Sequence, residues 1–203
     1  PEEVVIDWFA QIVLGVEHMH SHNTLHRDLK SQNIFLRRDH LAPGDRGGGG
    51  RRRVALGDFG IAKELQFNKD AAQTFIGTPI FMSPEMLRKV PYGHKADVWA
   101  MGCVLYEMMA LSEPFRAKTM EGLMRQVQHG QPHELPNAYS DELKDMCMRM
   151  LSKDPNVRPS AAELIRDSAA LRAACASALA GSRRAMQRPS AALRSISVSI
   201  SAS

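Results

Sequence analysis

The chain has 203 residues, of which 44% are hydrophobic and 24% charged, enough for one compact domain with a core. The formal net charge of +4 is modest and comes largely from local clusters such as Arg51-Arg52-Arg53, so we expect no nucleic-acid partner. No apolar run is long enough to cross a bilayer and no signal peptide opens the sequence, which favours an intracellular, cytoplasmic protein without a membrane partner. Cys103, Cys147 and Cys175 lie far apart in the sequence, and we expect buried free thiols rather than a metal site.

The first part of the chain is predicted to form a helix followed by two short strands. Apolar residues recur at three- and four-residue steps from Val5 to Met19, which predicts one apolar stripe on a helix. Strands are expected over residues 34–36 and 54–56. Between them, residues 37–53 are charged and glycine-rich, which predicts a flexible insertion in the turn. A mobile surface loop is the leading interpretation of this insertion, and a nucleic-acid or docking role for its arginines is the alternative.

The second part is predicted to be mostly helical. Residues 58–85 have few periodic apolar positions, as expected of a long functional loop. The segment 94–110 is apolar around nearly its whole circumference, which predicts a buried central helix. Amphipathic surface helices are expected over residues 119–129 and 140–151.

The last part begins with a helix and ends in biased sequence. Ser160 with Glu163 three residues later is a capping-box pattern, so a helix should start there. After Asp167 the sequence becomes rich in Ala, Ser and Arg. We therefore divide the chain into a folded domain, residues 1–167, and a low-complexity tail, residues 168–203, that is part frayed helix and part disordered.

Four short motifs follow one another in the order typical of protein kinases. The first is His26-Arg27-Asp28-Leu29-Lys30-Ser31-Gln32-Asn33-Ile34-Phe35, and the others are Asp58-Phe59-Gly60, Gly77-Thr78-Pro79 and Ser83-Pro84-Glu85. One such motif alone is weak evidence, whereas the ordered set is specific. The chain therefore resembles a eukaryotic protein kinase.

The residue types in these motifs suit phosphoryl transfer, which depends on positioning and on cancellation of charge. Asp28 can orient an attacking hydroxyl and accept its proton, and Lys30 can place a positive charge beside the transferred phosphate. Asn33 and Asp58 offer hard oxygen ligands that suit Mg²⁺. The resemblance implies ATP as the nucleotide, with Phe35 beneath its adenine ring.

The resemblance also implies structural roles for five residues. His26 and Phe59 would stack in the hydrophobic column that links the two kinase lobes, with Asp97 anchoring it from the buried helix. Glu85 should pair with Arg158 and so tie the end of the activation segment to the lower core.

Within the kinases, the sequence resembles the NIMA-related (NEK) serine/threonine kinases over roughly residues 1–167. The segments that carry this resemblance, besides the first motif, are Leu56-Gly-Asp-Phe-Gly-Ile-Ala-Lys63, Thr74-Phe-Ile-Gly-Thr-Pro79 and Trp99-Ala-Met-Gly-Cys-Val-Leu-Tyr-Glu-Met108. It implies the mainly α, large C-terminal lobe of a kinase with short β-hairpins, acting on Ser or Thr hydroxyls of protein substrates. A centrosomal, ciliary or cytoskeletal site is implied by family resemblance only.

A kinase also needs a Gly-rich loop and a small-lobe lysine, and neither precedes the first motif, so we expect the small lobe to be absent. The first hypothesis is an active serine/threonine kinase of which this chain is a part, inactive without the missing lobe or upstream chain as its partner. The alternative is a truncated lobe that acts as a non-catalytic binding or scaffold module. The intact Asp28, Asn33 and Asp58 argue against a pseudokinase scaffold.

Two threonines between the second and fourth motifs predict regulation. Thr78 resembles the residue that bonds toward the catalytic aspartate and lysine. Thr74 lies further from the anchored end of this segment, where a phosphate would find Arg27, and Lys63 as a second partner. We expect phosphorylation of Thr74 to activate the kinase, with an unmodified loop hydroxyl as the alternative.

Overall fold

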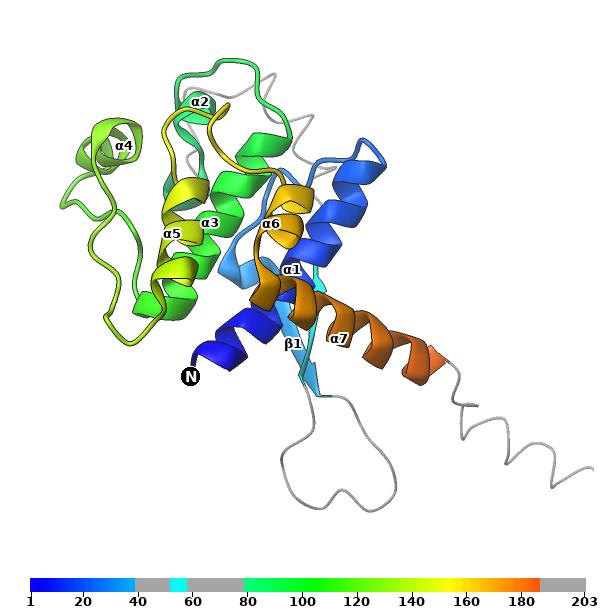
Figure 1. Ribbon diagram of the computed structural model, residues 1–203. Helices are drawn as coiled ribbons and strands as arrows, with labels where there is room; N and C mark the ends of the chain where they lie inside the picture. The colour runs from blue at the N-terminus through cyan, green and yellow to red at the C-terminus, as the bar shows by residue number, and fades with distance from the viewer. Residues whose placement is uncertain (39–51, 58–78, 187–203) are drawn as a thin grey trace, which may run out of the picture.

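The computed structural model describes residues 1–38, 52–57 and 79–186, and Figure 1 shows their arrangement. Within this part of the chain, seven α-helices and one two-stranded antiparallel sheet form a mainly helical body. The helices are α1 (Glu2–Ser21), α2 (Pro84–Leu87), α3 (His94–Ala110), α4 (Met120–His129), α5 (Asp141–Met150), α6 (Ala161–Asp167) and α7 (Ala169–Met186). The strands are β1 (Ile34–Arg38) and β2 (Arg52–Leu56), and the short 3₁₀ helices are η1 (Ser31–Asn33) and η3 (Pro79–Phe81).

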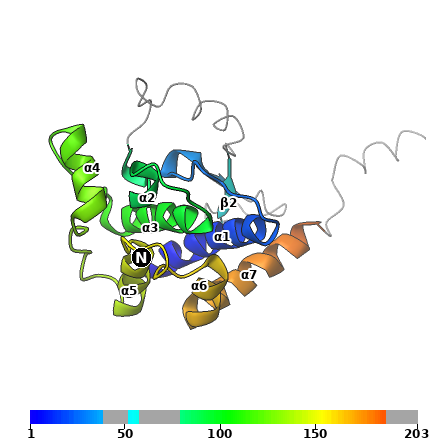
Figure 2. The ribbon, with the colours of Figure 1, turned by 90° about the horizontal axis from the view of Figure 1, so that it is seen from above.

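Helix α3 is the centre of the core, as its sequence predicts. Trp99, Met101 and Leu105 are fully buried, and most other residues of the helix are buried too. A helix that is apolar all round is stable only when other elements cover every side. Helices α1 and α5 pack against it, and Figure 2 shows α1 and α3 side by side.

Helix α1 carries the predicted apolar stripe and begins at Glu2, three residues before the first residue of that stripe. Phe9, Ile12 and Val16 are completely buried. On its sheet-facing side, a Cβ added at Gly15 would lie 2.8 Å from Leu56 Cδ1. The absence of a side chain there lets α1 and β2 approach closely, and this contact holds the hairpin against the body.

The hairpin is longer than the predicted strands because its arginines are paired. The register places Arg37 opposite Arg53 and Arg38 opposite Arg52, so the ends of the predicted insertion, residues 37–53, belong to the strands. Gln11 of α1 supports β2, because its Oε1 accepts from Val54 N at 2.9 Å and its Nε2 donates to Arg52 O at 3.3 Å. Residues 39–51 lie outside the described part of the chain.

The predicted surface helices form with side-chain caps. Thr119 caps α4 and Ser140 caps α5 through their hydroxyl oxygens. At α6 the complete capping box is present, since Ser160 Oγ accepts from Glu163 N and the Glu163 carboxylate accepts from Ser160 N.

Helix α7 forms an ordered element where the sequence suggests a low-complexity tail. Its side chains Leu171 and Cys175 are buried against α1, and Cys175 Sγ lies 3.6 Å from the carbonyl oxygen of Ala10. These two positions, four residues apart, place one apolar strip on a helix whose other residues are mostly alanine, serine and arginine. No helix within the described ranges is long and apolar enough to cross a membrane.

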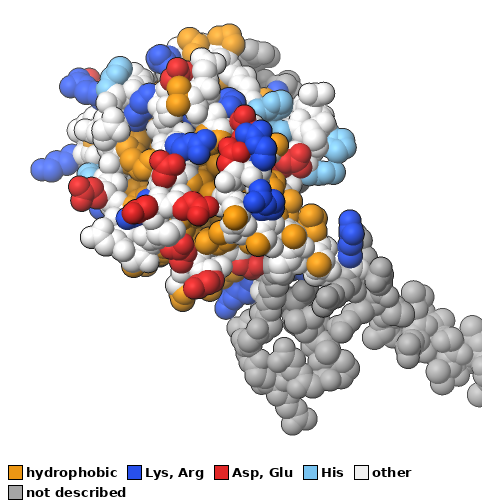
Figure 3. Space-filling view, viewed as in Figure 1, with side chains coloured by type: hydrophobic (Ala, Val, Ile, Leu, Met, Phe, Trp, Pro, Cys, Tyr) orange, Lys and Arg blue, Asp and Glu red, His pale blue; other side chains and the backbone are white. Residues whose placement is uncertain are grey.

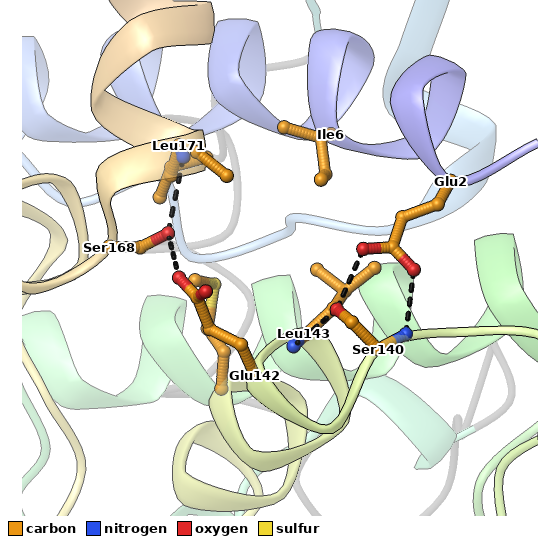
Figure 4. Close-up of a pocket in the computed structure, with 9 residues that line it drawn as sticks. Glu2, Ile6, Ser140, Glu142, Leu143, Ser168 and Leu171 are labelled. Carbon is orange, nitrogen blue, oxygen red and sulfur yellow. Dashed lines mark hydrogen bonds between the residues drawn. The ribbon is translucent and has the colours of Figure 1, made fainter.

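Two carboxylates tie α1, α5 and α7 together around a cavity of about 30 Å³, roughly the room of one water molecule (Figure 4). Glu2 accepts from Ser140 N and from its hydroxyl, both at 2.6 Å. Glu142 accepts from the Ser168 hydroxyl at 2.7 Å, and that oxygen caps α7 by accepting from Leu171 N at 3.1 Å. None of the residues predicted for the functional site lines this cavity.

Candidate active site

The loop between α1 and β1 brings Asp28, Lys30 and Asn33 together. Lys30 Nζ donates to Asp28 Oδ2 at 2.9 Å. Asn33 Nδ2 donates to the carbonyl oxygen of Asp28 at 2.8 Å and lies 3.3 Å from its Oδ2. Asn33 is 3% exposed, whereas the side chains of Asp28 and Lys30 are 21% and 33% exposed. The Asp28 carboxylate and the Lys30 ammonium group are therefore partly exposed to solvent, whereas the Asn33 amide that bonds to Asp28 is buried.

Asp97, in the first turn of α3, holds the start of this loop. Its carboxylate accepts from His26 N at 2.9 Å and from Arg27 N at 3.0 Å. Arg27 has φ 65°, in the left-handed region that costs free energy for a residue with a side chain. The two bonds offset that cost, because they satisfy both backbone donors inside the protein.

A third bond to Asp97 comes from His20 Nε2, at 2.9 Å. Burial by itself would raise the pKa of Asp97, but the hydrogen bonds from His20, His26 N and Arg27 N lower it below its usual value. His20 is not among the site residues predicted from the sequence. Its place in the last turn of α1, six residues before His26, is the signal that could have identified it.

The His26 side chain is completely buried, and burial lowers the pKa of its imidazole. The structure places its backbone, rather than its ring, against Asp97. The predicted stacking partner of its ring, Phe59, lies outside the described residues, so the column of His26 and Phe59 stays a prediction.

Phe35 on β1 exposes half of its surface beside the end of β2. A Cβ added at Gly57 would lie 2.5 Å from Phe35 Cε2, so this ring position requires glycine there. Gly57 N also donates to the carbonyl oxygen of Asn33 at 2.9 Å. Gly57, which directly precedes Asp58 in the chain, is thus hydrogen-bonded to Asn33, the other predicted metal ligand.

Glu85 and Arg158 meet in a buried bidentate ion pair. Arg158 Nη1 and Nη2 donate to the two Glu85 carboxylate oxygens at 2.7 and 2.9 Å, and the two side chains are 5% exposed or less. Arg158 also donates to Ser152 O and Lys95 O, and its guanidinium lies 5.0 Å from the centre of the Trp99 ring. Burial would raise the pKa of Glu85, but the hydrogen bonds from Arg158 lower it overall.

The remaining predicted site residues are Asp58, Phe59, Thr74 and Thr78, and all of them lie outside the described part of the chain. Arg27 is described, and its roles toward Thr74 and the site stay predictions. The structure thus brings one acid, one lysine and one amide together on a loop anchored to the core. The exposed ring of Phe35 follows Asn33 by two residues, and Gly57, next to Asp58 in the chain, is hydrogen-bonded to Asn33. This arrangement resembles a kinase catalytic loop, and the catalytic roles of its residues stay predictions.

Comparison with known proteins places the chain in a family. The protein kinase domain family matches residues 1–168, and the chain belongs to it. A solved structure described as the Rad53 kinase domain and SCD2 in complex with AMPPNP aligns with a TM-score of 0.64 and 26% identity, covering 84% of this chain and 59% of that one.

The curated relatives include NIMA-related kinases. Mouse serine/threonine-protein kinase Nek4 is 41% identical over 82% of this chain, and mouse Nek3 is 40% identical over 81%. Rice Nek6 is 39% identical, also over 81%. The chain spans only 19%, 30% and 28% of the lengths of these three relatives. The kinase and NEK resemblance and the mainly helical fold are therefore confirmed, whereas the absence of a small lobe and the domain boundary at residue 167 stay predictions.

Proposed function

We propose that this chain is the catalytic-loop part of a NEK-like serine/threonine protein kinase, which transfers the γ-phosphoryl group of ATP to Ser or Thr hydroxyls of protein substrates. The observation that carries the proposal is the cluster of Asp28, Lys30 and Asn33 on a loop that Asp97 anchors. The kinase family match and the serine/threonine kinases among the relatives support the same reaction class.

In the proposed reaction, Asp28 orients the substrate hydroxyl and accepts its proton. Its carboxylate is partly exposed, so a hydroxyl can reach it, and the Asn33 amide restrains the backbone that carries it. Lys30 lies 2.9 Å from the same carboxylate, which places one positive charge where the transferred oxygens would gather.

The residues fit a bound metal and nucleotide. Asn33 uses its Nδ2 toward Asp28 O, which leaves its Oδ1 as a hard oxygen ligand, and Asp58 would supply a charged second ligand. Phe35 presents an exposed aromatic face on which an adenine could rest. Bound Mg²⁺ would neutralise phosphate charge. The nucleotide analogue AMPPNP in the similar Rad53 structure supports this assignment.

The proposal is tested on the natural protein that contains this chain, with a generic Ser/Thr substrate and radiolabelled ATP. Asp28→Ala and Asp58→Asn should each remove most turnover and leave the circular dichroism spectrum unchanged. Glu134→Gln, an exposed acid on another loop, is the matched control and should retain turnover. Near-normal turnover in Asp28→Ala would refute the assigned role, and a wild-type protein that is folded but inactive would favour the non-catalytic scaffold.

A further inference from the structure

The charge of the chain is concentrated in two segments. Residues 37–53 and 168–203 together contain eleven arginines, no lysine and two acidic residues, a formal charge of +9. The remainder carries fifteen basic and twenty acidic residues, a formal charge of −5. The net charge of +4 is therefore the sum of a strongly basic part and an acidic part of the molecule.

The described parts of these two segments, on the hairpin and on α7, contact each other. Arg53 Nη2 on β2 donates to the carbonyl oxygen of Gly181 on α7 at 3.1 Å, and both elements pack against α1. The register pairs Arg37 with Arg53, and Arg183 follows Gly181 by two residues. In Figure 1 the hairpin extends below the body, and α7 runs from beside it toward the lower right. We call Arg37, Arg52, Arg53 and Arg183 the basic end.

The basic end is accessible, and neither β2 (residues 52–56) nor α7 (residues 169–186) contains an acidic residue. Arg37, Arg52 and Arg183 are exposed, and Arg53 is partly buried by its contact with α7. On α1, Asp7 lies one turn before Gln11 and bonds to its amide, so this acid lies near β2. Figure 3 shows that acidic side chains gather on the helical body rather than along α7.

The side chains around these arginines select the class of partner. Residues 37–38, 52–57 and 169–186 contain no Phe, Tyr or Trp. The one exposed ring beside them on β1 is Phe35, which packs against Gly57, so this surface offers no series of rings on which successive nucleic-acid bases could stack. Among the described side chains of α7, Leu179 is the one large hydrophobic residue that is exposed, at 49%, and the neighbouring residues are mostly Ala, Ser and Arg. Such a helix face offers too little apolar surface to enter a bilayer.

We infer that the basic end binds an acidic, Asp- and Glu-rich segment of a partner protein. Arginine suits this task because its planar guanidinium forms paired hydrogen bonds with carboxylates. Arg37 and Arg53 are opposite each other in the register and share one face of the hairpin, with Arg52 next to them on the other face. Arg53 contacts α7 at Gly181, two residues before Arg183, so several guanidinium groups lie at one end of the molecule. This inference does not depend on kinase activity, since none of these residues belongs to the proposed active site.

The experiment measures binding of the purified chain to a fluorescent twelve-residue Asp/Glu peptide by anisotropy at physiological salt. The test variant combines Arg37→Gln, Arg52→Gln and Arg183→Gln. The control variant combines Arg116→Gln, Arg125→Gln and Arg149→Gln, three exposed arginines elsewhere, so both variants lose the same charge. Circular dichroism checks that both fold.

We expect the test variant to bind the peptide at least about tenfold more weakly than the wild type, because several charge-assisted contacts are lost in this variant. The affinity of the control variant should stay within about threefold of the wild type, because it keeps those contacts. Equal weakening in both variants would overturn the inference, since net charge alone would then explain binding. Failure of the wild type to bind the peptide would also overturn it. Tighter binding to a duplex oligonucleotide or to phosphatidylserine vesicles would overturn the assignment to an acidic protein segment.

Discussion

At the scale of single residues, Asp97 fixes the backbone at the start of the loop that carries Asp28, Lys30 and Asn33. One buried carboxylate accepts hydrogen bonds from His20, His26 N and Arg27 N, and so holds Arg27 in a left-handed conformation. A buried acceptor with three donors is difficult to replace, because any change leaves at least one donor without a partner.

Asp97→Asn should therefore destabilise the chain by about 2 kcal/mol, since the new NH₂ group would face backbone N–H donors. The measurement is the free energy of unfolding in urea. Asp154→Asn is the matched control, because Asp154 is exposed and also accepts from a backbone N–H, that of Asn156. If Asp97→Asn lowers the free energy of unfolding no more than Asp154→Asn does, the hydrogen bonds to Asp97 contribute little to stability.

Gly57 sets the position of Phe35. In Gly57→Ala the added methyl would displace the ring or force it off its rotamer, at a cost of about 1 kcal/mol. If the adenine rests on this ring, the KM for ATP of the natural protein should rise about fivefold. Gly93→Ala, where an added Cβ meets nothing within 4 Å, should leave the KM unchanged. An unaltered KM in Gly57→Ala would separate Phe35 from nucleotide binding.

At the scale of elements, the Glu85–Arg158 pair joins α2 to the segment before α6. Glu85→Gln should cost about 3 kcal/mol at neutral pH, because it leaves Arg158 buried without its counter-ion. The control is Glu113→Gln, whose exposed pair with Arg116 should contribute less than about 0.5 kcal/mol.

The stability that the Glu85–Arg158 ion pair contributes should depend on pH. The folded-state pKa of Glu85 is below its usual value of 4.5, so its stabilisation is fully present above that pH and is lost as pH falls through the lowered pKa. The difference in unfolding free energy between wild type and Glu85→Gln should narrow below about pH 4.5. A difference that stays constant down to pH 3 would contradict the lowered pKa.

Helix α7 is held by a narrow strip of buried side chains. Leu171→Ala should cost about 2–3 kcal/mol in urea unfolding, because it removes a side chain that is 2% exposed. Leu179→Ala, at 49% exposure on the same helix, should cost less than about 1 kcal/mol. Equal effects of the two changes would mean that α7 is not docked on α1 in solution.

At the scale of the whole molecule, regulation would join the catalytic loop to the segment that follows Asp58. A phosphate on Thr74 would add about −1.5 to −2 charges and could bind Arg27, whose backbone Asp97 already fixes. In the natural protein, Thr74→Ala and Arg27→Ala should each lower activity several-fold, with the phosphate located by mass spectrometry. Thr78→Ala should lower activity without changing phosphorylation of Thr74. Full activity of Thr74→Ala, with Thr74 phosphorylated in the wild type, would place the switch elsewhere.

The sequence by itself determined the features that depend on local pattern. The buried helix 94–110, the capping box of Ser160 and Glu163 and the order of the kinase motifs could all be predicted. Each depends on periodicity, on a hydrogen bond between near neighbours or on residue chemistry at short spacing. The loop cluster of Asp28, Lys30 and Asn33 belongs here too, because its members are at most five residues apart.

Only the tertiary structure decided the contacts that join distant segments. His20 bonds to Asp97 across 77 residues, Gln11 supports Val54 across 43, and Arg53 reaches Gly181 across 128. No short-range pattern specifies such pairs, because they depend on how α1, α3, the hairpin and α7 pack. For the same physical reason, the alanine-rich segment after residue 168 gave only a weak helix signal, and burial of Leu171 and Cys175 against α1 made it part of the fold.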